Sequence, residues 1–323
     1  MEILFCVYAF IFGLCFGSFL NVVVLRGFSG ESIVLPPSKC PHCKHKLAWY
    51  DNIPVLSFLI LLGKCRYCKQ KISIQYPIVE LATGLLFLGL FYKFGFSLNF
   101  VFCSIAACLF VVMAVCDIKE KVIFEIHAYL LALLGLIYNF FNIPAETLAK
   151  VHFSLFGQMI TINQSFIYSV LGLIAGVIIM EGLARIPKFF IGKRAFGEGD
   201  SYIAGALGAF FGLPNLIVIL ILSVLFQSLI VLPMYFYKLF KAKDFKLLSA
   251  LILLFAMVIL FKIGDYAGVF ESTGFYIFSV VLLVLIGLYC CKRIFCSVKT
   301  ENNPTYLPFG PALLLAAVVV MFV

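Results

Sequence analysis

The sequence has 323 residues, of which 64% are hydrophobic and 12% charged, and its mean hydropathy is +1.13. Soluble domains usually carry about 25% charged residues, so this composition excludes a soluble globular protein, collagen, low-complexity disorder and a secreted disulfide scaffold. The net charge of +9 comes from 24 basic and 15 acidic residues. Its meaning depends on where the basic residues fall between the apolar segments.

Apolar segments of membrane-spanning length fill most of the chain. A helix needs about 20 apolar residues to cross the hydrocarbon core, and shorter ones cross when neighbouring helices help. Only helices satisfy the backbone of such runs in lipid. We therefore predict an all-α fold, a polytopic membrane bundle of about eight to ten transmembrane helices. The candidate spans are 3–25, 77–97, 99–116, 122–142, 165–186, 201–213, 215–237, 247–264, 274–291 and 309–323.

The basic residues predict the orientation of this bundle. All of the 24 basic residues except Lys93, Lys150 and Lys262 fall on one face, which the positive-inside rule assigns to the cytoplasm. Both termini then lie outside. The first segment has no basic region before it and is interpreted as a span, not a cleavable signal. The charge is explained by orientation, so membrane lipid is the expected partner and nucleic acid is not.

The large polar segment, residues 26–76, carries four of the twelve cysteines. Cys40 and Cys43 form one CxxC pair, and Cys65 and Cys68 form a second. Two such pairs can present four thiolates tetrahedrally to one zinc ion. We predict a small cytoplasmic zinc-ribbon-like loop with one structural zinc ion, because four thiolates leave no open position for a substrate.

Three alternatives remain for these cysteines. They could form a redox pair or stay unliganded, and His42 or His45 could replace one thiolate as a ligand. A pair of structural disulfides is disfavoured by a reducing cytoplasm. No internal repeat is expected in the chain.

Two aspartates lie at the same predicted membrane boundary. Asp117 ends the third predicted span, and Asp200 begins the sixth in the sequence Gly197-Glu198-Gly199-Asp200. Two neighbouring carboxyls share a proton, so one can activate water while the other protonates a substrate carbonyl. Gly197 and Gly199 would let an extended peptide approach the helix start. Helix capping by Asp200 is the simpler alternative, but the shared depth favours an aspartyl peptidase.

Glu80 is a third acidic residue of interest, because it lies just inside the second predicted span. A carboxylate at that depth needs a partner, so a functional role is predicted for it. Glu120, Glu125 and Glu198 are interpreted as charges at the membrane boundary.

These motifs, in this order, resemble those of the type IV prepilin peptidase family of membrane aspartyl proteases. The markers lie between residues 13 and 212 and return at 308–323. The matching stretches are 17–23, the two CxxC pairs with 47–57 between them, 72–84, Asp117, 197–200 and 308–311.

The resemblance implies cleavage of the short basic leader of type IV prepilins or pseudopilins at the cytoplasmic face of the bacterial inner membrane. Asp117 and Asp200 would be the catalytic pair. It also implies N-methylation of the new terminus with S-adenosylmethionine, an activity linked to the N-terminal part. Glu80, Asn21 and Arg26 are the candidate methyltransferase or substrate-site residues there. No glycine-rich nucleotide fingerprint supports the methyl donor independently.

The chain departs from the family pattern near the two aspartates. Ser201-Tyr202 follows Asp200 where a hydrophobic residue and lysine are common, and the proline expected after Asp117 is missing. Proline is also absent after Arg26. These changes bear on substrate fit and leave both aspartates in place. The family usually has about eight spans, so 247–264 and 274–291 are interpreted as an insertion.

We expect three parts: an N-terminal part with the zinc loop (1–98), a peptidase core (99–237) and a C-terminal membrane segment (238–323). A polytopic transporter or an inactive assembly scaffold with a structural zinc loop is the alternative. The sequence makes no prediction of oligomeric state.

Overall fold

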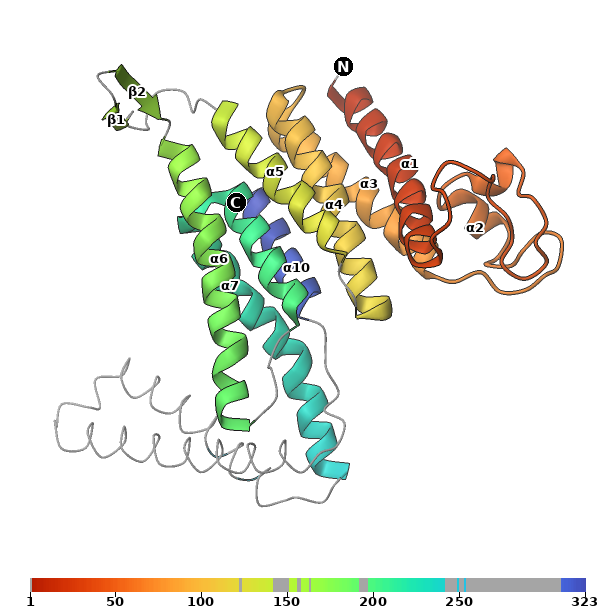
Figure 1. The fold of residues 1–323 in the computed structure, drawn as a ribbon. Helices are drawn as coiled ribbons and strands as arrows, with labels where there is room; N and C mark the ends of the chain where they lie inside the picture. Colours follow the sequence, from red (N-terminus) through yellow and green to blue (C-terminus); the bar gives the residue numbers. More distant parts are fainter. Residues whose placement is uncertain are drawn as a thin grey trace, which may run out of the picture. The chain divides into compact units, whose positions relative to one another are not determined.

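The computed structural model of the chain describes residues 2–121, 124–141, 151–155, 158–162, 164–191, 197–241, 249, 253 and 309–323. They belong to two compact units (Figure 1). The first comprises Met1–Arg185, Arg194–Val224 and Pro308–Val323, and the second comprises Ile186–Lys193 and Leu225–Leu307. All of the predicted site residues belong to the first unit. The predicted spans 247–264 and 274–291, apart from residues 249 and 253, lie outside the described residues.

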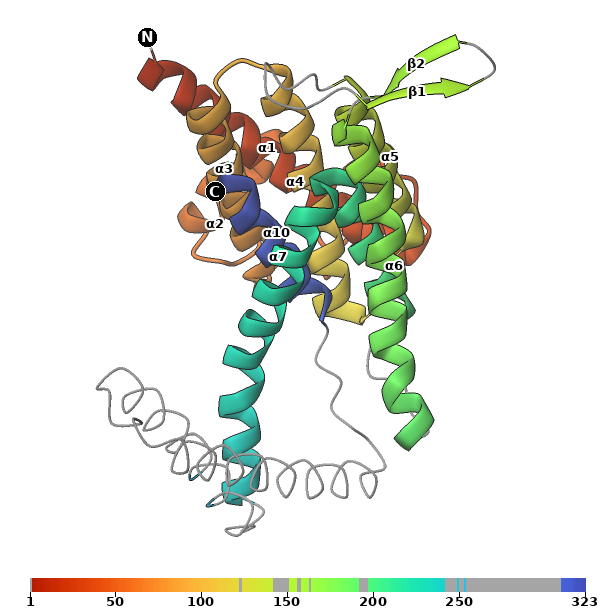
Figure 2. The same cartoon turned by 90° about the vertical axis from the view of Figure 1, so that its left-hand side faces the viewer.

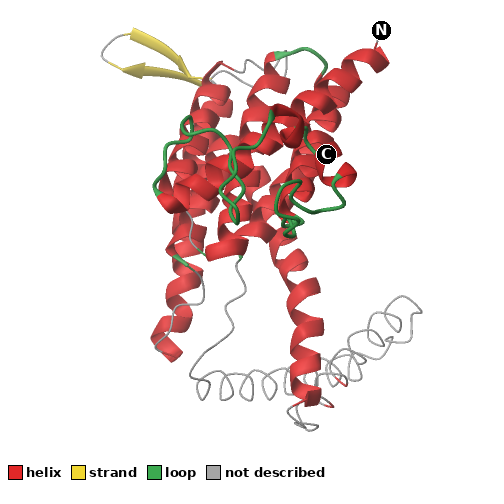
Figure 3. Ribbon diagram, turned by 90° about the vertical axis from the view of Figure 1, so that its right-hand side faces the viewer, coloured by secondary structure: helices red, strands yellow, loops and turns green. Residues whose placement is uncertain are grey.

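The apolar segments of the first unit are helical, as Figure 3 shows in red. Among the described residues, five helices, α1, α3, α4, α6 and α7, are long and apolar enough to cross a membrane, and α5 and α10 are shorter apolar helices. The predicted helical membrane bundle is confirmed. The helices are α1 (Glu2–Ser29), η1 (Trp49–Asn52), α2 (Leu56–Ile60), α3 (Gln75–Phe94), α4 (Leu98–Glu120), α5 (Glu125–Phe141), α6 (Gln164–Ile191), α7 (Glu198–Lys241) and α10 (Gly310–Phe322).

One described segment between the predicted spans 122–142 and 165–186 is not helical. It contains two short strands, β1 (Val151–Leu155) and β2 (Gln158–Ile162), beside the helical bundle. They pair antiparallel, with Val151 opposite Ile162.

Helix α1 lies closely against α3 because glycines replace side chains at the contact. A Cβ atom at Gly17 would lie 2.7 Å from the Glu80 Cα, and one at Gly13 would lie 2.9 Å from the Gly84 Cα. Small residues allow this approach in lipid, where packing has to replace the hydrophobic effect. The contact fixes the depth of Glu80 relative to α1.

Helix α7 is broken at Gly212, whose φ of 77° and ψ of 166° are not helical. Its two legs run in opposite directions in Figure 1. This break separates the predicted spans 201–213 and 215–237. It frees backbone carbonyls at the end of the first leg, and Asn139 of α5 donates to those of Ala209 and Phe210 at 3.1 and 3.0 Å. The Ser169 hydroxyl of α6 also donates to the Ala209 carbonyl.

The first leg of α7 crosses α6 at a set of small residues. Gly172 meets Gly208, and Gly176 meets Ala204, with backbone against backbone. Gly172 and Gly176 have the four-residue spacing of close membrane helix pairs. Together with Asn139, this contact holds the short leg that begins at Glu198.

Replacing Gly176 with alanine is expected to lower the thermal unfolding midpoint of the detergent-solubilised protein. The new Cβ would collide with the Ala204 backbone, and overpacking of this kind costs about 1–3 kcal/mol. A Cβ atom at Gly182 of the same helix would have no such neighbour within 4 Å. The control Gly182→Ala should therefore keep or raise the midpoint, since glycine weakens a helix interior by about 0.5–1 kcal/mol relative to alanine. Equal midpoints for the two variants would contradict the described crossing.

Candidate active site and metal centre

Three helix ends meet around Asp117 and Asp200. Asp117 lies in the last turn of α4, Asp200 lies in the first turn of α7, and α10 begins at Gly310. Both aspartates are buried, with exposed fractions of 5% and 6%. Their carboxylates are near enough to interact electrostatically. Figure 2 shows α4, α7 and α10 side by side. The two residues that were placed at one depth from the sequence are thus neighbours in space.

The backbone of Gly310 lies against this carboxylate pair. Its amide interacts with both Asp117 and Asp200, and a Cβ atom at this position would collide with the Asp117 Oδ2. That position therefore requires glycine. Residues 308–311 were part of the family resemblance, but no role was predicted for Gly310. Every residue other than proline has a backbone amide, so the sequence does not indicate which amide contacts a site.

The two carboxylates differ in their hydrogen bonds. Asp200 accepts a bond of 3.2 Å from the Gly197 backbone N–H. It therefore contributes to capping the start of α7 from the third helical position, and it is not itself the N-cap residue. The buried Oδ2 of Asp117 has no hydrogen-bond partner among the described residues. An unpaired buried acceptor is costly, and a bound water or substrate group would satisfy it. Gly199 lies in the first turn of α7, one residue before Asp200.

The four cysteines form a second cluster, in the loop between α1 and α3. The sulfurs of Cys40, Cys43, Cys65 and Cys68 all lie within 4.8 Å of one another, and those of Cys40 and Cys68 are 3.9 Å apart. A metal ion bound tetrahedrally by four sulfurs at about 2.3 Å holds those sulfurs about 3.8 Å from one another. The cluster could therefore hold a metal ion.

Each CxxC pair is held in the same turn. The Cys40 amide donates to the His45 carbonyl at 2.9 Å, and the Cys65 amide donates to the Gln70 carbonyl at 2.8 Å. Lys44 and Lys69, one residue after each pair, have positive φ of 57° and 60°. Residues 38–47 and 63–72 both contain the pattern K-C-x-x-C-K-x-K. The expectation that the chain has no internal repeat is therefore wrong.

The thiols differ in acidity because their surroundings differ. Burial opposes ionisation of Cys40, but hydrogen bonds from the Cys43 and His42 backbone amides outweigh it and lower the pKa to about 7. For Cys68, the Gln70 backbone favours the thiolate, but burial and the neighbouring thiols outweigh it and raise the pKa to about 11. Four thiols this close cannot all ionise without a nearby cation, and a divalent ion would supply that charge.

Asp51 joins the segment between the two pairs to the second turn. Its carboxylate accepts hydrogen bonds from the Arg66 Nε at 2.8 Å and from the Tyr67 hydroxyl at 3.2 Å. Burial opposes ionisation of Asp51, but the hydrogen bond from Arg66 outweighs it and lowers the pKa. The His45 ring packs on that of Tyr67, with centroids 3.7 Å apart. Asp51 was noted only as part of the family resemblance.

Glu80 and Asn21 line the junction of α1, α3 and the loop. Glu80 is buried and accepts a hydrogen bond of 2.7 Å from the Val55 backbone N–H. This is the partner that its depth required. Asn21 donates to the Tyr76 carbonyl at 3.3 Å, while its buried Oδ1 has no partner within the described ranges. The structure thus brings Glu80 and Asn21 to the same junction and leaves one acceptor of Asn21 free.

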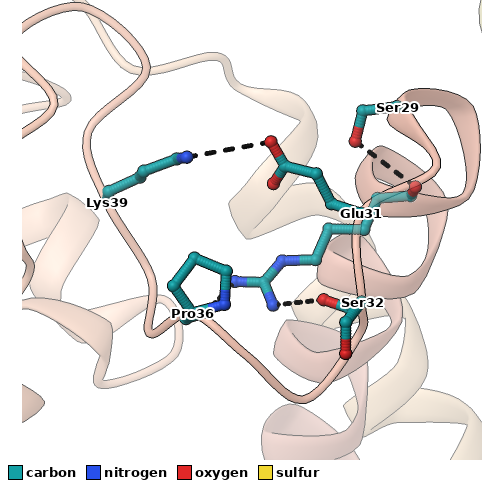
Figure 4. Close-up of polar contacts among 6 residues, drawn as sticks. Ser29, Glu31, Ser32, Pro36 and Lys39 are labelled. Carbon is teal, nitrogen blue, oxygen red and sulfur yellow. Dashed lines mark hydrogen bonds and ion pairs between the residues drawn. The ribbon is translucent and has the colours of Figure 1, made fainter.

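Arg26 lies at the end of α1 and holds the start of the loop. Its guanidinium donates to the carbonyls of Ser32 and Pro36 at 2.7 and 2.5 Å. Figure 4 shows Ser32 and Pro36 at this contact, with Glu31 paired to Lys39 nearby. Arg26 therefore has a structural role in addition to any contact with a substrate.

Known families cover most of these site residues. Residues 11–94 match the family model of the bacterial peptidase A24 N-terminal domain, and residues 103–232 match that of the type IV leader peptidase family. No solved structure matches the chain.

Several curated relatives carry the name prepilin leader peptidase/N-methyltransferase. The protein of Myxococcus xanthus is 35% identical over 207 residues, which are 64% of this chain and 56% of that protein. The match therefore spans little more than half of the Myxococcus protein. The relative in Pectobacterium carotovorum is 34% identical over 68% of this chain and 81% of its own length. The relative in Klebsiella pneumoniae is 32% identical over 64% of this chain and 84% of its own length.

The cysteine geometry predicts that the purified protein carries one divalent ion per chain. Cys65→Ser removes a ligand and should release the ion, because three thiolates and a serine hydroxyl bind it far more weakly. Elemental analysis after purification without chelators measures the stoichiometry. The control is Cys103→Ser, which changes a buried thiol of α4 outside the cluster and should keep the ion. A metal-free parent protein, or full occupancy in Cys65→Ser, would contradict the site.

Proposed function

We propose that this chain, which belongs to the type IV leader peptidase family, removes the leader of type IV prepilins or pseudopilins by an aspartyl peptidase reaction of Asp117 and Asp200. The observation that carries the proposal is the meeting of these two buried carboxylates beside the Gly310 amide. A water-activating pair needs this proximity. The curated relatives carry the corresponding name.

In the proposed reaction, the pair holds one proton between its two carboxyls. The ionised carboxylate takes a proton from water, and the resulting hydroxide attacks the scissile carbonyl carbon. The protonated carboxyl gives its proton to the carbonyl oxygen. The tetrahedral intermediate then collapses, and a proton passes to the leaving amine. The unpaired Oδ2 of Asp117 is a ready acceptor for the bound water.

The surrounding backbone supports this chemistry. The starts of α7 and α10 both lie at the pair, and helix N-termini stabilise negative charge. Burial keeps bulk water away from the carboxylates and strengthens their interaction. The absence of a Cβ at Gly310 leaves the amide close to both side chains. Gly197 and Gly199 leave room for the extended substrate at the start of α7.

We place the reaction at the cytoplasmic face of the inner membrane. The chain is a multi-pass membrane protein of this family, and its basic residues predict which face is cytoplasmic. A transporter would need carboxylates near the middle of the bilayer, whereas Asp117 and Asp200 lie at helix ends. Peptide cleavage therefore fits the geometry better than transport does.

We assign the four-cysteine cluster to one structural zinc ion. Four thiolates in two CxxC turns are the donor set that zinc prefers. The ion would replace a hydrophobic core in the small loop, and it would take no part in cleavage. Elemental analysis that found iron in place of zinc would overturn this assignment.

We further propose that residues 1–98 methylate the newly exposed N-terminus and that residues 99–237 form the peptidase core. The two family models, which meet between residues 94 and 103, support this division. S-adenosylmethionine would supply the methyl group. The Glu80 carboxylate and the unpaired Asn21 Oδ1 suit its positive charge and N–H donors, and Arg26 holds the loop beside them.

Asp117→Asn and Asp200→Asn should each reduce cleavage of a co-reconstituted prepilin by about 100- to 10,000-fold, because each removes one acid–base group. Mass spectrometry of the prepilin measures the loss of its leader. The matched control is Glu120→Gln, three residues beyond Asp117 and exposed, which should retain full activity. Normal processing by both Asn variants would end the peptidase proposal.

Gly310→Ala should reduce cleavage by about 100-fold, because displacement of a reacting group by about 1 Å has an effect of this size. The new methyl group would push the Asp117 carboxylate away from its position. The alanine variant should still unfold at a temperature close to that of the parent protein. Unchanged cleavage would show that Gly310 does not position the pair.

Glu80→Gln should lower the ratio of methylated to unmethylated product at equal leader cleavage. The amide can still accept the Val55 bond, but it lacks the charge that would attract the methyl donor. Intact-mass analysis of the mature pilin with added S-adenosylmethionine reports both activities at once. A normal ratio in Glu80→Gln would remove Glu80 from the proposed methyltransferase site.

A further inference from the structure

The loop between α1 and α3 exposes apolar side chains that neither its fold nor its cysteine cluster uses. Trp49 is 79% exposed, Ile60 66% and Leu62 84%. We call this set the apolar edge of the loop; its members are Trp49, Leu56, Leu59, Ile60 and Leu62. The 3₁₀ helix that begins with Trp49 lies next to α2, so the members of the set come from neighbouring elements. Soluble surfaces rarely gather so many large apolar groups.

Local geometry makes Leu62 more unusual. It has a positive φ of 50° at the end of α2, a position where glycine is the usual residue. Its side chain is nevertheless almost fully exposed. An almost fully exposed leucine at a strained backbone position is consistent with a side chain that a surface outside the loop covers.

The opposite side of α2 is already occupied. The Phe58 ring lies over Gly63, where a Cβ atom would be 3.0 Å from it, and the Gly63 amide donates to the Phe58 carbonyl at 2.9 Å. Leu59 and Ile60 therefore face away from the loop. Residues 56–62 are too few to cross a bilayer, so any contact that they make with lipid would be at its surface.

The same loop carries several exposed lysines. Lys44, Lys46, Lys64, Lys69 and Lys71 are exposed and form no ion pair with described residues. The two acidic residues of the loop, Glu31 and Asp51, pair with Lys39 and Arg66. An apolar strip with tryptophan and excess lysine is typical of segments that lie in the interface of an anionic membrane.

We propose that the apolar edge of the loop inserts into the headgroup region of the membrane that α1 and α3 cross, and that the lysines bind its anionic lipids. The loop is tied to this bilayer at both ends, because α1 and α3 are candidate spans. A basic peptide leader is the competing occupant, but the charge of the loop would repel it. The proposal does not depend on the peptidase reaction.

Insertion into the membrane would stabilise the cysteine-bearing loop in addition to the metal ion. The cysteine cluster fixes the two turns from inside, and the lipid surface holds the segment between them from outside. Arg26 and Glu80 join the same loop to α1 and α3. The loop is thus held close to the membrane at the junction where Glu80 and Asn21 lie.

Trp49 is the chain's single tryptophan, so its fluorescence tests the proposal directly. The full-length protein is placed in nanodiscs of phosphatidylcholine and phosphatidylglycerol. We expect a blue-shifted emission, loss of emission with lipids brominated near the headgroup, and protection from iodide. Emission typical of water with full iodide quenching would overturn the proposal. Protection from iodide without quenching by brominated lipid would also overturn it, because protein would then cover the edge.

The double variant Leu59→Gln, Ile60→Gln should shift the Trp49 emission toward that of water and reduce quenching by brominated lipid. Gln70→Ser, an exposed polar change in the same loop, is the matched control and should leave both unchanged. The metal content of each variant reports whether the loop is folded. Undiminished lipid quenching in a metal-loaded double variant would contradict insertion through α2.

Discussion

Two carboxylates are buried next to each other in this protein, and the arrangement of the surrounding helices depends on compensating their charge. Asp117 comes from the C-terminal end of α4 and Asp200 from the N-terminal end of α7, and α10 supplies a backbone amide that interacts with both. Two such groups are tolerated inside a membrane protein only when donors or a shared proton compensate their charge. The starts of α7 and α10 provide this compensation through their free N–H groups.

The short first leg of α7 follows from that arrangement. It begins near Asp200 and ends at Gly212, so it is about 21 Å long at 1.5 Å per residue. A leg of this length needs its freed carbonyls satisfied within the protein. Asn139 and Ser169 do this from α5 and α6. The glycine contacts between α6 and α7 then hold the leg in place.

The sequence predicted those features whose signal is local. Cys40 to Cys68 could be assigned to one cluster because ligand spacing limits how two CxxC turns meet. The common depth of Asp117 and Asp200 followed from counting spans between them. The break at Gly212 falls within two residues of the gap between the predicted spans 201–213 and 215–237.

Other features depend on contacts that have no local signal. Gly310 acts through its backbone and lies far from Asp117 along the chain. Val55, the partner of Glu80, is an ordinary apolar residue that contributes only its backbone N–H, so its side chain does not indicate this role. The repeat of the two cysteine turns was missed because their variable positions differ, although hydrogen bonding makes them equivalent. The β-hairpin at 151–162 did have a local signal, because Val151-His152-Phe153-Ser154-Leu155 alternates apolar and polar residues, but the search for membrane-spanning runs passed over so short a segment.

The buried carboxylates of Glu80 and Asp117 differ in how the loss of hydration is compensated. Glu80 satisfies its carboxylate with a backbone amide of the loop, so its burial joins the cysteine-bearing segment to α3. Asp117 leaves one oxygen unpaired and relies on a second acid nearby. A satisfied carboxylate stabilises a fold, whereas an unsatisfied one remains available to a ligand. Glu80 therefore anchors the loop in addition to its proposed contact with the methyl donor, and the Asp117 oxygen is the point where we propose that water binds.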